Sequence, residues 1–311
     1  MKFFGAKRRP GWLCINLMPD RVDISHVVLR GNARPEVRLC DSYRKEGDEV
    51  ATLKRLRREL DLGSYRCTTL LKASDYQVLQ VEAPNVPAAE MKIAMRWRIK
   101  DLIDFPVETA TVDAIMIPQG DNTATRGSQA LAIAAHNEVI AATAKTFSDA
   151  GIPLEVIDIP ELAQRNVARF FEETGRGLAL LAFDATGGLL TFTCNGELYQ
   201  YRRIDHPLAD FAGISDEQRQ LVYERIVLEL QRSLDNFDRQ FRQVAISKVV
   251  VAPVPGAAGL QEYLASNLGV PVTTLDLSQI MDFPRIPELR EPVHQTQCLQ
   301  VIGGSVREAA A

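Results

Sequence analysis

The chain has 311 residues, of which 46% are hydrophobic and 24% are charged, so it can bury a sizeable core and exceeds one average domain. We therefore expect two domains. The formal net charge of -4 at pH 7 argues against a general nucleic-acid-binding protein, whose surface would be basic. No apolar run approaches the roughly 20 residues that span a bilayer, and the basic N-terminus leads into a strand rather than a signal peptide. These features predict a cytoplasmic protein.

The cysteines and histidines carry no metal-binding signature. The five cysteines fall mostly inside predicted strands, where a cysteine behaves as a small buried hydrophobe. No CxxC or HExxH motif occurs, and the four histidines share no metal-ligand spacing. We expect reduced structural thiols and no metal site within the protein.

The first 74 residues predict three strands, a helix and a fourth strand. Residues 12–17 and 22–29 have the pattern of a hairpin, because an apolar run, a turn and an alternating run follow one another. Leu53, Leu56 and Leu60 then recur at helical spacing. The predicted elements are, in order, residues 12–17, 22–29, 36–40, 50–60 and 67–71.

Residues 75–127 predict an inserted strand, helix and strand. The strands are expected at residues 76–81 and 109–117, with a helix over residues 88–103 between them. The polar residues 121–128 lack a pattern and predict a mobile loop. The apolar residues on one stripe of the helix are Met91, Met95, Ile99 and Leu102.

After this insert the alternation resumes, and the second half repeats the plan of the first. Asn195-Gly196 is typical of the type I′ turn of a hairpin, because both residues tolerate positive φ. The elements expected before residue 177 are strand 131–135, helix 138–150, strand 154–159 and helix 161–173. Those of the second half are strands 178–183, 189–194 and 197–203, a helix from about 216 to 241, strand 248–252, helix 260–268 and strand 272–275.

The duplicated order of three strands, a helix and a strand predicts the fold. Hairpin-linked strands followed by right-handed crossovers build a mixed sheet covered by helices, a plan that resembles the actin-like superfamily. We therefore predict an α/β protein with two actin-like (ribonuclease H-like) domains, each opening with a β-hairpin. The first domain is assigned to residues 1–74 and 128–176, the small inserted subdomain to 75–127, and a truncated second domain to 177–311.

Four segments, in this order, resemble PilM-like proteins of type IV pilus assembly, and most closely the MshI branch that serves the mannose-sensitive haemagglutinin (MSHA) pilus. The first is VEAPNVPAAEMKIAMRWRIKDLIDFPVETATVDAIMI, which is similar to the inserted subdomain of that family. The others are AAHNEVIAATAKTFSDAGIPLEVIDIPELAQRN, LELQRSLDNF and LQEYLASNLGVPVTTLD. Together they cover most of the chain, and their order supports the match more than any single segment does.

The resemblance implies a nucleotide site in which hairpin turns hold the phosphates, but this chain departs from it. The first turn reads NLMP at residues 16–19, where Asn16 replaces the metal-facing carboxylate and Pro19 lacks an N–H. The stretch matching the adenosine-binding glycine run reads PVPG at residues 253–256. Only residues 204–215 stand where the family has an adenine-covering subdomain, too few for a separate packed unit. We therefore expect a pseudo-ATPase without a bound cofactor.

The second turn reads DATGG at residues 184–188 and keeps an acid and a glycine pair. It is either a surviving phosphate turn or a tight hairpin, and the residues alone leave both readings open. If a nucleotide binds, the expected contacts are Asp184, Gly187, Gly188, Gly303 and Gly304.

The first hypothesis for the function is a binding protein. The resemblance implies a cytoplasmic component of the pilus platform, recruited to the inner membrane by the cytoplasmic tail of a bitopic PilN-like (MshJ-type) partner. The stripe on the inserted helix is alternatively the core of the insert itself, whereas the Phe-Pro pair beside Trp97 is the better candidate for an exposed patch. The positions that match the family's tail-binding groove are Trp97, Leu102, Ile103, Phe105 and Pro106.

A residual actin-like ATPase or small-molecule kinase is the alternative hypothesis. Asp184 would then hold a metal-bound water, and the glycines named above would let the backbone approach ATP and its magnesium ion. Asn16 argues against this reading, because a phosphotransferase needs intact phosphate turns and a catalytic acid. A third hypothesis is the GspL-type cytoplasmic domain of a secretion platform, which would continue into a transmembrane helix that we do not predict in these 311 residues.

Overall fold

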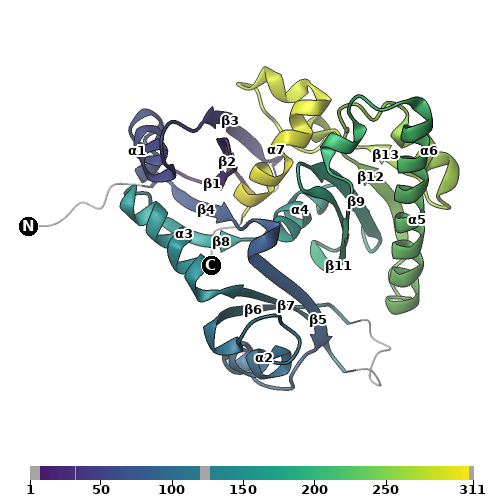
Figure 1. Ribbon diagram of the computed structural model, residues 1–311, viewed down its shortest axis with the longest axis horizontal. Coiled ribbons are helices and arrows are strands. Elements are labelled where there is room, and N and C mark those ends of the chain that lie inside the picture. The colour runs from purple at the N-terminus through teal and green to yellow at the C-terminus, as the bar shows by residue number, and fades with distance from the viewer. Residues whose placement is uncertain (1–7, 32, 120–126, 308–311) are drawn as a thin grey trace, which may run out of the picture. The chain divides into compact units, whose positions relative to one another are not determined.

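The computed structural model describes residues 8–31, 33–119 and 127–307 (Figure 1). Its strands are β1 (Trp12–Leu17), β2 (Arg21–Val28), β3 (Glu36–Arg44), β4 (Arg66–Leu70), β5 (Tyr76–Glu82), β6 (Ala110–Met116), β7 (Gln129–His136), β8 (Leu154–Asp158), β9 (Gly177–Asp184), β10 (Gly187–Cys194), β11 (Glu197–Ile204), β12 (Ile246–Val251) and β13 (Val272–Thr274). Its α-helices are α1 (Glu49–Leu60), α2 (Met91–Ile99), α3 (Asn137–Asp149), α4 (Pro160–Ala168), α5 (Asp216–Gln240), α6 (Leu260–Asn267) and α7 (Pro292–Ser305). The loop predicted at residues 121–128 lies almost entirely outside the described residues.

Hairpin β1–β2 opens the first five-stranded sheet, whose strand order is β3-β2-β1-β4-β8. The two strands of the hairpin are antiparallel and in register, from Trp12 opposite Val27 to Leu17 opposite Val22. The first four residues of β1 are all buried, so both faces of this strand are covered. This explains why residues 12–15 are continuously apolar instead of alternating with polar residues.

The second five-stranded sheet repeats the plan of the first, in the order β11-β10-β9-β12-β13. The central strand is β1 in the first sheet and β9 in the second, and each is the first strand of its sheet along the chain. The two strands that follow it in sequence lie on one side, and the two strands reached by crossovers lie on the other. Asn195 and Gly196, between β10 and β11, have φ values of 53° and 76°, as the predicted type I′ turn requires. The duplicated order predicted from the sequence is therefore confirmed.

A separate three-stranded antiparallel sheet of order β5-β7-β6 carries α2 on one face (Figure 1). Met95 and Ile99 of α2 are fully buried and pack in one cluster with Val81 and Ala132 of the sheet. The helix is shorter than predicted, because residues 88–90 form a separate 3₁₀ turn after Pro87 and the α-helix ends at Ile99. Since β7 is the central strand, this sheet continues past the boundary expected at residue 127.

Helix α7 packs against α4 and against the hairpin β1–β2. Gly303 lies at the contact with α4, where an added Cβ would stand 2.0 Å from the carbonyl oxygen of Ala163. Asn166 of α4 donates a hydrogen bond from Nδ2 to the Gly303 carbonyl oxygen at 3.0 Å. On the other side, Ser305 Oγ lies 3.3 Å from Ser25 Oγ of β2. One helix thus attaches the C-terminal part of the chain to its first hairpin.

Helix α7 was not predicted from the sequence. Pro292 at its first position is a helix-start signal, but Gly303 and Gly304 near its end argue against a helix. Nine of its 14 residues are buried, so the helix lacks the amphipathic pattern by which a surface helix is recognised.

The chain divides into two compact units, one of Met1–Arg9 with Arg44–Ile159 and the other of Pro10–Tyr43 with Pro160–Ala311. The packing of α7 on β1 and β2 explains why the first three strands group with the C-terminal part. The domain boundaries expected from the sequence follow the repeated strand order instead, and they stay a prediction.

We predict that Gly303→Ala lowers the free energy of unfolding by about 3 kcal/mol, because the new methyl group would overlap the Ala163 carbonyl and force the helices apart. Urea denaturation of the purified protein measures this change. Gly269→Ala is the matched control, since no atom lies within 4 Å of its added Cβ, and we expect it to stay within about 0.5 kcal/mol of the parent. Equal stability of the two variants would contradict the packing role of Gly303.

Candidate functional site

The first hairpin turn offers few hydrogen-bond donors to a phosphate group. The backbone N–H of Met18 donates to the carbonyl oxygen of Arg21 at 3.0 Å, which closes the turn between β1 and β2. Asn16 donates from Nδ2 to the Met18 sulfur at 3.4 Å, and Pro19 has no N–H. The exposed Asp20 adds a negative charge at the tip. This turn is therefore suited to closing a hairpin and poorly suited to an anion.

The second turn uses its acid for a local hydrogen-bond pattern. Asp184 Oδ1 accepts the backbone N–H of Thr186 at 2.7 Å and the Thr186 hydroxyl at 2.6 Å. This arrangement is an Asx turn, in which a side chain stabilises the backbone two residues further on. Of the two readings left open by the sequence, the tight hairpin explains these contacts without any ligand.

The four glycines predicted to approach a nucleotide lie close to other parts of the protein. An added Cβ at Gly187 would stand 2.7 Å from the Ile204 carbonyl oxygen, and one at Gly188 would stand 2.7 Å from the Phe183 ring. Gly303 packs on Ala163, and Gly304 is buried in α7. Packing therefore accounts for Gly187, Gly188 and Gly303, whereas their role in binding a nucleotide stays an untested prediction.

The short segment between β11 and α5 packs onto the loop of residues 253–256, which contains two prolines. Residues 208–211 form a single 3₁₀ turn that ends at Phe211, which is only 1% exposed. An added Cβ at Gly256 would stand 2.7 Å from the Phe211 carbonyl oxygen, and the Phe211 ring lies 5.2 Å from that of Phe183. Phe211 thus connects the loop at residues 253–256 with the end of β9. Phe211 was not predicted as a buried residue from the sequence, although a lone aromatic residue in a short linker is a signal of burial.

The residues predicted to bind a partner fall into two groups. Trp97 is 71% exposed, Leu102 is 54% exposed, and Pro106 is also exposed. Ile103 is instead buried in the core of the insert, and the half-buried Phe105 packs against that core. The Phe105 ring stacks on His136 with the centroids 3.9 Å apart. The expected stripe is therefore the core of the insert at Met95 and Ile99, while Leu102 at its end is exposed.

One exposed residue on α2 was missed by the sequence analysis. Ile93 is 64% exposed and precedes Trp97 by four residues, so both side chains project from the face of α2 opposite Met95 and Ile99. The spacing of Ile93 and Trp97 was a signal available from the sequence, but the apolar stripe on the other face of the helix obscured it. We call Ile93, Trp97 and Leu102 the α2 surface.

The cysteines are placed as structural thiols. All five are buried, and none of them forms a disulfide. Burial raises the pKa of the Cys67 thiol to about 12, which makes it a poor nucleophile at neutral pH. Within residues 8–31, 33–119 and 127–307, no group of three His, Cys, Asp or Glu side chains could hold a metal ion. Across the same residues, no helix has the length and hydropathy that a membrane span requires.

The sequence has no match among family models or among curated proteins. Among solved structures, a chain of the "PilM-PilN type IV pilus biogenesis complex" is similar over 96% of this chain and 100% of its own length, with a TM-score of 0.75 and 19% identity. The cytoplasmic domain of EpsL, an inner membrane component of the type II secretion system of Vibrio cholerae, is similar over 96% of both chains, with a TM-score of 0.50 and 14% identity. A Bacteroides thetaiotaomicron protein with an actin-like ATPase fold and unknown function covers 91% of this chain and 95% of its own, with a TM-score of 0.49 and 11% identity.

The likeness to the PilM-PilN structure extends over nearly the whole chain, and it confirms the predicted fold class. The protein is an α/β protein with two actin-like domains and a small inserted sheet. At 19% identity this likeness shows the fold, and the function has to be argued from the surfaces of this chain.

We predict that the protein binds Mg-ATP weakly or not at all. The Met18 N–H is already used within the first turn, and Pro19, Pro253 and Pro255 have no N–H to donate. Calorimetry at millimolar Mg-ATP measures the affinity. A micromolar dissociation constant, equivalent to about -8 kcal/mol, would contradict the prediction. If weak binding is found, Asp184→Ala should abolish it.

Proposed function

We propose that this protein is a cytoplasmic component of a type IV pilus assembly platform that binds the cytoplasmic tail of a bitopic inner-membrane partner and does not turn over ATP. The observation that carries the proposal is the exposed apolar α2 surface, on the side of the helix that faces away from the inserted sheet. The likeness to a structure described as a PilM-PilN complex supports the choice of system. The finer assignment is to the MshI branch of the MSHA pilus with a PilN-like (MshJ-type) partner, and it is supported by the four sequence segments quoted above.

The α2 surface has the character of a contact site. Single exposed apolar residues are ordinary, but Ile93 and Trp97 share one helix face, and Leu102 follows three residues after the helix ends. Lys100 Nζ lies 5.8 Å from the Trp97 ring centroid, so a basic group flanks the aromatic ring. Tryptophan is among the residues that most often dominate binding energy at interfaces. Trp97, with Ile93 on the same helix face, therefore carries the proposal.

The sheet beside α2 offers an edge to an extended tail. β6 is an edge strand of the β5-β7-β6 sheet, so one row of its main-chain groups is not used within that sheet. α2 contacts β6, and Lys92 Nζ pairs with Asp113 of that strand at 2.9 Å. An added strand would form main-chain hydrogen bonds with β6 while its apolar side chains reach exposed residues such as Met116. Ile103 and Phe105 support this arrangement from the core.

The runner-up is a residual ATPase or small-molecule kinase of the actin-like class. It would rely on Asp184 and on the glycines of the second turn. However, the Asp184 carboxylate already accepts two hydrogen bonds from Thr186. The space beside Gly187 and Gly188 is already filled by other atoms of the protein. A platform of the type II secretion kind is a second candidate, and the likeness to the cytoplasmic domain of EpsL favours it. In that case the same α2 surface would contact a different membrane protein.

We predict that Trp97→Ala weakens tail binding by about 2 kcal/mol without lowering stability. The Trp97 side chain is 71% exposed, so its removal should leave the free energy of unfolding within about 0.5 kcal/mol of the parent. Fluorescence anisotropy with a labelled synthetic peptide of the cytoplasmic tail of a PilN-like protein measures affinity, and thermal denaturation measures stability.

Two control variants separate the binding surface from the core. Leu221→Ala removes a similarly exposed apolar side chain from α5 and should leave binding unchanged. Phe105→Ala should lower stability by on the order of 2 kcal/mol, because the ring packs on the insert core and on His136. Unchanged tail affinity of a well-folded Trp97→Ala protein would rule out the α2 surface as the binding site.

A further inference from the structure

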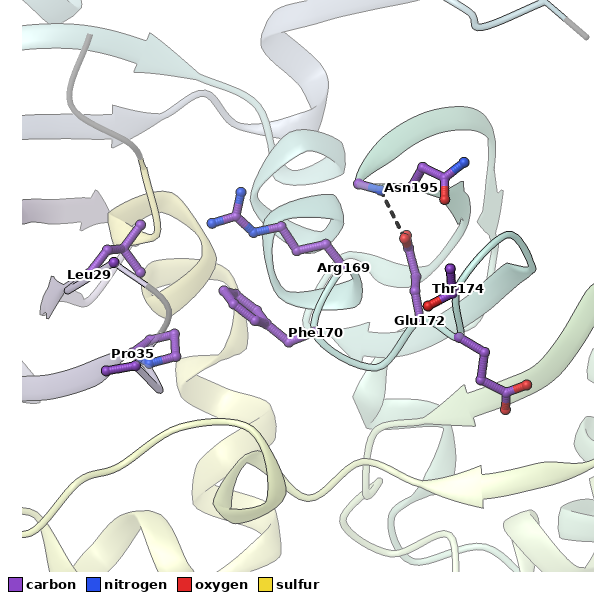
Figure 2. A pocket seen from close by; sticks show the side chains of 11 residues that line it. Leu29, Pro35, Arg169, Phe170, Glu172, Thr174 and Asn195 are labelled. Atoms are coloured by element: carbon purple, nitrogen blue, oxygen red, sulfur yellow. Dashed lines mark hydrogen bonds between the residues drawn. The ribbon is translucent and has the colours of Figure 1, made fainter. Parts of the chain in front are cut away.

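A cavity of about 730 Å³ lies in the unit formed by residues 10–43 and 160–311 (Figure 2). Three segments line it, which are the loop between β2 and β3, the residues that follow α4, and the turn between β10 and β11. Glu172 on its wall accepts the Gly196 N–H at 2.8 Å, and the Arg169 guanidinium lies over the neighbouring phenylalanine ring. Glu173 lies 3.8 Å from each of two basic side chains. The protein itself thus engages the charges on this wall, whereas unpaired cations lie in the other unit.

Helix α1, in the unit that contains residues 44–159, exposes three basic side chains. Lys54 precedes Arg57 by three residues and Arg58 by four, so the three lie on neighbouring positions of the helix surface. None of the three forms an ion pair with a residue in the described part of the chain. The partial negative charge at the end of a helix favours arginines in the last turn, but it does not cancel their charge.

The Arg57 side chain lies between the end of α1 and the end of α3. An added Cβ at Gly63 would stand 3.5 Å from Arg57 Nε, and one at Gly151 would stand 3.3 Å from it. Glycine at both positions leaves room for the stem of the arginine, while the residue stays exposed. Its guanidinium group is thus held at the surface, at one end of the unit.

Three further arginines lie at the same end of this unit. Arg9 donates to Asp61 Oδ2 at 3.0 Å, and Asp61 directly follows the last turn of α1. Arg8 and Arg66 both pair with Glu155 at the start of β8. We call these three arginines and the three exposed cations of α1 the basic end.

The basic end carries more positive than negative charge. Its six basic side chains share the carboxylates of Asp61 and Glu155, which leaves an excess of four positive charges. Two further acids nearby, Glu59 and Asp149, are each paired with a basic residue four positions earlier. The whole chain has a net charge of -4, so this end is opposite in sign to the protein as a whole.

The sequence next to Arg8 indicates which anionic partner fits. Two lysines and two adjacent phenylalanines come shortly before it, at Lys2, Phe3, Phe4 and Lys7. Cations attract anionic lipid head groups, and bulky apolar side chains beside them enter the boundary of the acyl chains. A nucleic acid or an acidic protein would be attracted by the same charges, but the phenylalanine pair favours a surface with an apolar interior.

We propose that the basic end docks on the surface of a membrane that contains anionic lipids, with arginine guanidinium groups contacting the lipid phosphates. A planar guanidinium group can donate two hydrogen bonds to one phosphate, which suits arginine to this contact. The proposal needs no partner protein. Its failure would therefore leave the proposed binding of a tail at the α2 surface standing.

The test is co-sedimentation of the full-length protein with lipid vesicles. One set of vesicles contains phosphatidylcholine with roughly 30 mol% phosphatidylglycerol, and the other contains phosphatidylcholine alone. At about 0.1 M salt we expect binding to the anionic vesicles and little binding to the neutral ones. Binding should be lost at about 1 M salt, because the screening length falls to about 3 Å.

The double variant Arg57→Gln and Arg58→Gln tests the residues directly. We expect about fivefold weaker partitioning for each charge removed, and on the order of 20-fold for both. Both residues are exposed, so the melting temperature should stay near that of the parent. The matched control is Arg225→Gln with Arg242→Gln, which removes the same charge from exposed positions of the other unit and should bind as the parent does. If the first variant does not fold, Lys54→Gln takes its place, with about fivefold weaker partitioning expected.

Two further variants separate the contributions to binding. Phe3→Ser with Phe4→Ser should weaken vesicle binding at constant salt, because apolar area is lost. Trp97→Ala should leave vesicle binding unchanged while it weakens tail binding. Equal vesicle binding by the two arginine double variants, no preference for anionic vesicles, or tighter binding to a DNA duplex at the same salt would overturn the proposal.

Discussion

The close contact between α7 and α4 at Gly303 is the constraint on which the unit of residues 10–43 and 160–311 depends. The Ala163 carbonyl oxygen occupies the space that a side chain at residue 303 would need. The two helices can therefore come this close only because residue 303 is a glycine. Asn166 then bonds to the Gly303 carbonyl, and Ser305 reaches Ser25 on the first hairpin. A single residue type at one position thus lets the last helix contact both α4 and the first strands.

Close packing also explains the glycines of the second turn. A glycine pair after an acid resembles a phosphate turn when the sequence is considered alone, but space at a turn is decided by its neighbours. Ile204 and Phe183 lie where side chains at Gly187 and Gly188 would stand, and Phe211 lies against Gly256. Glycine at these positions allows close packing of the hairpin and the shortened linker. Within this fold, packing inside the protein therefore accounts for the glycines at these three positions.

The two faces of α2 differ in physical character. Met95 and Ile99 are fully buried against the inserted sheet and hold the helix in place. Ile93 and Trp97 on the opposite face are exposed, so removal of their apolar area from water would drive binding there. A partner could therefore cover the exposed face without disturbing the contacts that hold the helix on its sheet.

The sequence by itself determined the order of the strands and of the helices before α7, the type I′ turn at Asn195-Gly196 and the actin-like fold, because these depend on local periodicity and turn chemistry. It also gave Trp97 as a candidate contact residue, but it could not separate Trp97 from Ile103 and Phe105, since exposure depends on which helix face packs on the sheet. Only the tertiary structure revealed α7, because nine of its 14 residues are buried, polar and glycine residues among them, and no amphipathic pattern marks the helix in the sequence. The cavity beside residues 169–174 could not be predicted from the sequence either. Its walls come from three separate segments of the chain that only folding brings together.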